Sequence, residues 1–116
     1  MQLLNTSEIE IKKSKFYGYC YLIEQKEEIK EILTELKKTH KKASHIVYAY
    51  KFSTTAGKSD DKEPSGSAGL PLYHMLEKLN LNNTLIIVVR YFGGTKLGVG
   101  PLTRAYLEAG KKSLPN

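Results

Sequence analysis

Two glycine-rich loops in the second half of the chain carry residue types that could bind an anion. Residues 65–69 (SGSAG) lead into Pro71, and residues 93–100 (GGTKLGVG) lead into Pro101. Proline is favoured at the first position of a helix, so each loop predicts a helix start. Glycines just upstream let backbone N–H groups turn toward one point, and the helix dipole adds positive potential there. The pattern predicts an anion-facing surface.

Three basic side chains surround the second loop: Arg90 precedes it, Lys96 lies within it, and Arg104 follows in the next helix. They could bind phosphate around a nest of backbone N–H groups. Alternatively, the two arginines pair with acidic side chains and fasten the two loops together, and both roles can coexist. The candidate anion- or nucleic-acid-binding residues are Arg90, Gly93, Gly94, Lys96, Gly98, Arg104, Ser65, Gly66 and Ser67.

Three acids, Asp60, Asp61 and Glu63, precede the first loop. Hard cations such as Mg²⁺ take carboxylate ligands, so the cluster could hold a metal ion. The same side chains could equally cap backbone N–H groups or pair with basic residues. Because no second ligand cluster exists in the sequence, we expect no metal site and place these loop acids close to Arg90 or Arg104.

Nothing in the sequence identifies a catalytic residue or a cofactor site. The loops lack GxxxxGK[ST], and no GxGxxG occurs with a strand and an acidic partner. Cys20 falls in the middle of an apolar strand, which predicts a buried, inert thiol. His45 is the one histidine that could join a site, although a structural role is favoured.

Composition predicts one soluble domain spanning residues 1–116, with a sizeable core. Hydrophobic residues make up 41% of the chain and charged residues 26%, and the net charge is +6. That balance favours polyanionic partners such as RNA. The sequence has no membrane-spanning run and no secretory leader, so we expect a cytoplasmic protein without a membrane partner. The oligomeric state is left open.

Periodicity predicts an α+β fold with one sheet. The expected order is strand, strand, helix, strand, helix, strand, helix, and a long irregular loop spans residues 53–69. All three helices have one apolar stripe, so we expect them on the same face of the sheet. The predicted strands are 8–12, 15–23, 44–52 and 84–90, and the predicted helices are 26–38, 71–79 and 101–114.

Five tyrosines on two predicted strands should share the opposite face: Tyr17, Tyr19, Tyr21, Tyr48 and Tyr50. This tyrosine row could be ordinary half-exposed strand residues, since tyrosine is a good strand former. It could also form a stacking face for bases or for a partner protein.

Two long segments, residues 63–71 (EPSGSAGLP) and 90–98 (RYFGGTKLG), closely resemble the Impact N-terminal domain family, which includes bacterial YigZ. The strand 45–50 and Ser14-Lys15-Phe16 are similar too. The resemblance implies a fold like the second domain of ribosomal protein S-five and domain IV of elongation factor G. It also implies a cytoplasmic role in regulation of translation, and it supplies no catalytic residues.

Three departures from the family pattern stand out. Lys62 and Pro101 replace glycines, and the C-terminal ferredoxin-like domain usual in bacterial relatives lies outside these residues. We expect a non-catalytic binding module acting on RNA, the ribosome or a translation factor. The alternatives are an enzyme acting on a phosphorylated substrate and a protein-interaction adaptor that uses the tyrosine row.

Overall fold

The computed structural model describes residues 1–116 and contains one five-stranded sheet, in which every neighbouring pair of strands is antiparallel. The strands lie in the order β1-β2-β5-β3-β4. Their bounds are β1 (Gln2–Ile11), β2 (Ser14–Leu22), β3 (His45–Lys51), β4 (Ala56–Ser59) and β5 (Thr84–Tyr91). The α+β class and the single sheet are confirmed. None of the helices has the length and apolar character needed to cross a membrane.

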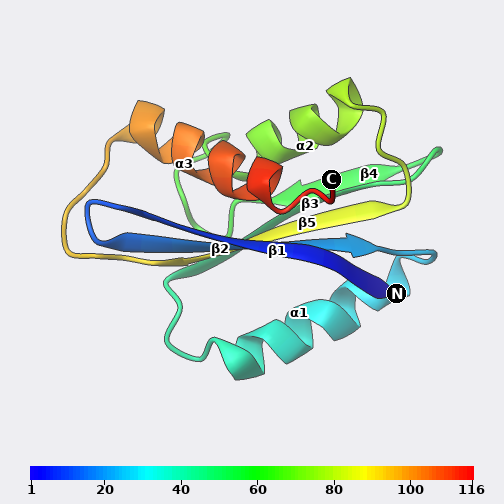
Figure 1. Cartoon of the computed structure of the whole chain (residues 1–116), viewed down its shortest axis with the longest axis horizontal. Coiled ribbons are helices and arrows are strands. Elements are labelled where there is room, and N and C mark those ends of the chain that lie inside the picture. Colours follow the sequence, from blue (N-terminus) through cyan, green and yellow to red (C-terminus); the bar gives the residue numbers. More distant parts are fainter.

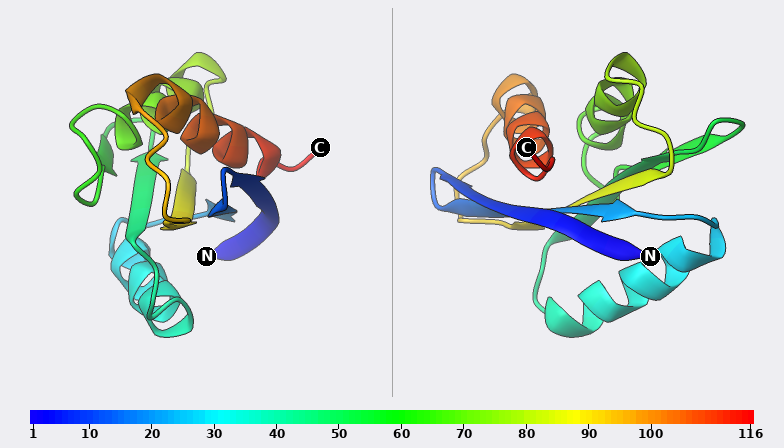
Figure 2. Two further views of the ribbon diagram at one scale, coloured as in Figure 1. Left: turned by 90° about the vertical axis from the view of Figure 1, so that its left-hand side faces the viewer. Right: turned by 45° about the vertical axis from the view of Figure 1, so that its right-hand side comes forward.

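The three helices divide between the two faces of the sheet, as Figure 1 shows. One face carries α2 (Gly69–Lys78) and α3 (Val99–Lys112), and the other carries α1 (Glu27–Thr39). The prediction that all three helices share a face is therefore wrong. Each helix does bury an apolar stripe, but a stripe does not say which side of the sheet receives it. The two further views show the same three layers (Figure 2).

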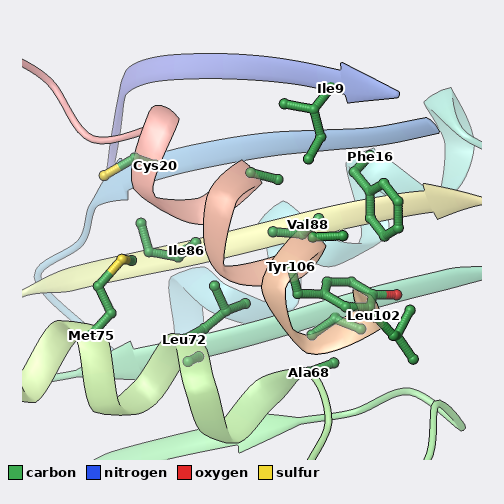
Figure 3. Close-up of a cluster of buried hydrophobic side chains, with 14 of the residues drawn as sticks. Ile9, Phe16, Cys20, Ala68, Leu72, Met75, Ile86, Val88, Leu102 and Tyr106 are labelled. Carbon is green, nitrogen blue, oxygen red and sulfur yellow. The ribbon is translucent and has the colours of Figure 1, made fainter. Parts of the chain in front are cut away.

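Strand β5 has buried residues on both faces of the sheet, so helices must cover both faces. Its residues from Thr84 to Arg90 are all buried. Ile86 and Val88 pack with α2 and α3, whereas Leu85 and Ile87 belong to the cluster under α1. A continuous β-branched run, rather than an alternating one, indicates such a doubly covered strand. Figure 3 shows the α2–α3 side of this core, where Leu72, Met75 and Tyr106 reach toward the sheet.

The tyrosine row shares one face as predicted, but it is not an open stacking face. Its five members pack against the apolar cluster that includes Ile29, Ile32 and Leu36 of α1. Tyr19 and Tyr91 also hold the ring of His40, with hydroxyl-to-nitrogen distances of 2.7 and 2.6 Å. Burial lowers the pKa of His40, which favours the neutral ring between these two hydroxyl groups.

Several element boundaries differ from the prediction for local reasons. The β1–β2 turn is formed by Lys12 and Lys13, whose φ angles of 47° and 69° match a two-residue hairpin turn. The loop 53–69 contains the short strand β4, which its Gly, Ser and Thr content concealed. The last two helices begin two residues before their prolines, so each proline still falls in the first turn, where no N–H is needed.

Cys20 is buried at 1% exposure, and burial raises the pKa of its thiol to about 11. The buried position predicted for this cysteine is confirmed. Because the thiolate is the reactive form, a thiol with this raised pKa is inert at neutral pH.

The packing of α1 against the sheet should contribute a large share of stability. Ile32 is 4% exposed in the cluster under α1, so Ile32→Ala should lower the free energy of unfolding by about 2–4 kcal/mol. Urea titration followed by far-ultraviolet circular dichroism measures it. Lys30→Ala, two residues away on the exposed side of the helix, is the matched control. Equal, small effects of both substitutions would mean that α1 is not docked.

Candidate functional site

A buried ion pair joins the two loops that the sequence singled out. Arg90 at the end of β5 donates from Nη1 to Oε2 of Glu63 at 2.7 Å, and both side chains are at most 6% exposed. The hydroxyl of Tyr106 in α3 donates to the same carboxylate oxygen. Burial and the contact with Glu63 raise the pKa of Tyr106, so the hydroxyl stays protonated. The alternative in which an arginine fastens the loops is the one observed.

The guanidinium of Arg90 is also held from three other directions. The rings of Phe16 and Phe92 lie 5.4 and 5.7 Å from it. Its Nη2 donates to Oγ of Ser14 at 3.3 Å, and the backbone N–H of Gly93 donates to the same oxygen at 3.1 Å. Only Nε of Arg90 lacks a hydrogen-bond partner. Arg90 therefore positions the start of β2 against the Gly93 turn.

His45 joins this network from the neighbouring strand β3. Its Nδ1 lies 2.7 Å from the carbonyl oxygen of Asp61, so Nδ1 carries the proton and donates. Its Nε2 faces Oε1 of Glu63 at 3.4 Å. The side chain is 22% exposed, so His45 is more open to solvent than Glu63 and Arg90. The structural role favoured for His45 is consistent with these contacts.

Asp60 occupies the anion position that the first glycine loop creates. Its carboxylate accepts hydrogen bonds from the N–H groups of Gly66, Ala68 and Gly69 at 2.9, 3.2 and 2.7 Å. Burial alone would raise the pKa of Asp60, but these three bonds, together with nearby Lys58, outweigh burial and lower it below its ordinary value. The anion at the start of α2 is thus a side chain of the protein itself.

Asp61 ties the same loop to β3. Its carboxylate accepts the N–H of Ile46 at 2.6 Å. Asp61 and Lys62 have φ angles of 43° and 71°, a region in which glycine is at ease. Lys62 thus adopts a backbone conformation that is more common for glycine. The three loop acids serve three different sets of donors, and no group of three or more His, Cys, Asp or Glu side chains is placed to hold a metal ion.

The candidate anion-binding residues separate into three groups. The first group makes hydrogen bonds within the protein and consists of Arg90, Gly93, Ser67 and Gly66. Arg104 is exposed and does not line the pocket next to the Gly93 turn, whereas Arg90 and Lys96 do. Ser65, Gly94, Lys96 and Gly98 remain exposed.

A pocket of about 390 Å³ opens beside this network, and we call it the α3-entry pocket. Its polar lining comes from His45, Glu63, Arg90 and Lys96, and its remaining lining is Pro64, Phe92, Leu97, Gly98, Val99 and Leu102. No side chain caps the N-terminus of α3 at Gly98, in contrast to α2 with its Asp60. The first N–H groups of a helix have no partner within the helix, so positive potential faces this pocket.

Five exposed lysines lie around the pocket end of the sheet, and we call this set the basic end. They come from three loops that Figure 1 places together at the left: Lys12 and Lys13, Lys41 and Lys42, and Lys96. The loops are joined through Gly93, which abuts the backbone of Lys13, and through Ser44, whose Oγ accepts the N–H of Phe92 at 2.9 Å. None of the five forms a salt bridge.

Sequence reasoning missed three members of the network: Ser14, Ser44 and Tyr106. Of these three residues, only Tyr106 could have been found from a local sequence pattern. It occupies an apolar-stripe position of α3 with Leu102, Ala105 and Ala109, and a tyrosine buried there needs a partner for its hydroxyl group. The two serines act through long-range contacts that no local pattern reveals.

Removing one partner of the buried pair should be costly. Glu63→Ala should lower the free energy of unfolding by about 3–5 kcal/mol, because it leaves the Arg90 guanidinium buried and unpaired. The triple substitution Glu63→Leu, Arg90→Met, Tyr106→Phe removes both charges and the hydroxyl, so it should cost less than Glu63→Ala. Urea unfolding measures both. A triple variant less stable than Glu63→Ala would contradict this account.

Asp60→Asn should lower the free energy of unfolding by about 1–2 kcal/mol at neutral pH, because the capping carboxylate is lost. The folded-state pKa of Asp60 is lowered, so its contribution is complete above the unfolded value of about 3.9 and is lost as pH falls through the folded value. The gap between wild type and variant should therefore shrink only in acid. Urea titrations across pH measure it, with exposed Glu108→Gln as control; an equal gap at every pH would contradict it.

Comparison with known proteins agrees with the motifs and the fold. The family model of the Impact N-terminal domain matches residues 12–114. The IMPACT family member YvyE of Bacillus subtilis is 41% identical over 102 residues, which are 85% of this chain and 47% of that protein. The IMPACT family member YigZ of Escherichia coli is 35% identical over 102 residues, 84% of this chain and 50% of that protein. The chain thus spans about half the length of these curated relatives.

Two solved structures share the arrangement of strands and helices. A crystal structure of a hypothetical protein superposes with a TM-score of 0.90 at 31% identity, covering 97% of this chain and 60% of that one. The two-domain translational regulator Yih1 superposes with a TM-score of 0.61 at 21% identity, covering 96% of this chain and 46% of that one. The second likeness concerns the fold alone. From the family match and the bacterial relatives together, the chain belongs to the Impact N-terminal domain family.

Proposed function

We propose that this protein is a non-catalytic module of translational control that binds the phosphate backbone of RNA through the basic end. The observation that carries the proposal is the gathering of Lys12, Lys13, Lys41, Lys42 and Lys96 on three joined loops without an acidic partner. Phosphate contacts from lysine supply most of the affinity of sequence-independent binding. The similar solved structure Yih1 is described as a translational regulator, which supports translational control as the process in which such RNA binding would act.

The α3-entry pocket suits one phosphate group at the centre of this surface. Lys96 lines it, and the uncapped N-terminus of α3 opens onto it. Phe92 at its rim is 50% exposed and offers a ring on which a base can stack. Backbone binding with little reading of sequence is the mode that this combination favours.

The geometry favours an enzyme acting on a phosphorylated substrate less strongly. Glu63 is the one buried carboxylate in the pocket, and it already accepts from Arg90 and Tyr106 and faces His45. A general base needs a free lone pair within reach of the substrate proton. Glu63 is instead committed to holding the two loops together.

Binding of a fluorescein-labelled twelve-nucleotide uridine RNA tests the proposal by fluorescence anisotropy at several salt concentrations. The affinity should fall by roughly 0.7 log unit per log unit of salt for each phosphate neutralised. Lys96→Ala, Lys13→Ala and Lys41→Ala should each weaken binding and lower that slope by about one contact.

Lys30→Ala is the control, because it removes the same charge from the far part of α1 and should change nothing. Equal weakening by Lys30→Ala would mean diffuse attraction to a protein of charge +6. No RNA binding at low salt would show that the proposal is wrong.

A further inference from the structure

The outer surface of helices α2 and α3 carries an apolar groove that the proposed RNA-binding function does not use. It has a volume of about 540 Å³, and its apolar lining includes Leu70, Met75, Leu79 and Leu107. Leu79 is 49% exposed and Leu107 is 37% exposed, so two large side chains on facing helices lie open to solvent. Two exposed leucines that line one groove make this surface a candidate site of interaction.

The groove has one sign of charge. His74 and Lys78 of α2 and Lys111 of α3 are the ionisable side chains that line it, and no Asp or Glu does so. The nearby carboxylate of Glu77 accepts the hydroxyl of Tyr73 at 2.7 Å and is turned to its own helix. Charge complementarity therefore favours an acidic occupant.

The shape and lining of the groove narrow the class of occupant. The lining residues run from Gly66 and Leu70 to Leu79, the whole length of α2, which at ten residues is about 15 Å long. An amphipathic helix of about three turns matches that length, with apolar anchors at i, i+3 or i+4, and i+7. Single-stranded RNA fits poorly, because the lining has no Phe, Tyr or Trp for bases to stack on. A second copy of this chain, also rimmed by lysines here, would meet like charge.

We propose that the groove between α2 and α3 is a docking site for an acidic amphipathic helix of a partner protein. Leu79 and Leu107 would contact the apolar face of that helix, and Lys78 and Lys111 would pair with the carboxylates that flank it. The groove lies on different elements from the basic end, so the chain can hold RNA and the partner helix together. This inference does not rest on RNA binding.

Two synthetic peptides of fourteen residues test the proposal. Both have leucine at i, i+3, i+4 and i+7, with acetylated and amidated ends; one has glutamate at the flanking positions and its twin has lysine. We expect the glutamate peptide to bind and to shift backbone amide signals of α2 and α3 in two-dimensional nuclear magnetic resonance spectra. Leu79→Ser with Leu107→Ser should weaken it at least tenfold while leaving RNA binding unchanged.

Charge reversal gives the sharpest outcome. The double variant Lys78→Glu with Lys111→Glu should no longer bind the glutamate peptide and should bind the lysine peptide instead. The control Lys30→Glu with Lys96→Glu has the same change of net charge elsewhere and should still prefer the glutamate peptide. The proposal is overturned by any one of three results: no peptide binding at millimolar concentration, equal loss in both double variants, or uridine RNA displacing the peptide from the groove. A wild-type dimer in sedimentation that Leu79→Ser with Leu107→Ser dissociates would overturn it as well.

Discussion

The buried pair of Glu63 and Arg90 is the contact on which the architecture of the site depends. It connects the loop before α2 with the end of the central strand, and Tyr106 and Ser14 attach α3 and β2 to the same point. A buried ion pair is stabilising only when its remaining donors and acceptors are satisfied. Here two aromatic rings and the hydroxyl groups of Ser14 and Tyr106 surround the charges, and only Nε of Arg90 lacks a partner. The pair therefore joins four elements at one point.

That joint also decides which groups can meet a ligand. Anion-binding geometry occurs at both glycine loops, but Asp60 fills the first, and the hydroxyl groups of Ser14 and Ser44 take the N–H groups of Gly93 and Phe92 at the second. The protein thus uses most of its backbone donors internally. What remains for a partner is the uncapped start of α3 and the lysines of the basic end, which have no internal acceptor.

Division of the helices between two faces separates two surfaces of different chemistry. Placing α1 over the tyrosine row buries Tyr50 and leaves the other four tyrosines half-buried against the cluster under the helix. The opposite layer, α2 and α3, leaves an apolar groove with a lysine rim along its outer side. The basic end lies on loops at one end of the sheet, whereas this groove lies along α2 and α3.

The sequence alone determined those features that depend on local chemistry. Periodicity located all three helices and four of the five strands, and the apolar run at 84–90 marked a central strand. The motifs at residues 63–71 and 90–98 also predicted the family to which the chain belongs. Each of these features depends on residues a few positions apart, so one segment of the chain is enough to predict it.

Only the tertiary structure decided which face each helix covers and which donors stay free. An amphipathic stripe has the same pattern whichever side of the sheet receives it, so the position of α1 could not be read from residues 26–38. Likewise, Arg90 and Arg104 have the same chemistry in the sequence, yet one is buried against Glu63 and the other is exposed. The partners of Arg90 lie 27 and 76 positions away in the sequence, and these contacts exist only once the sheet has formed.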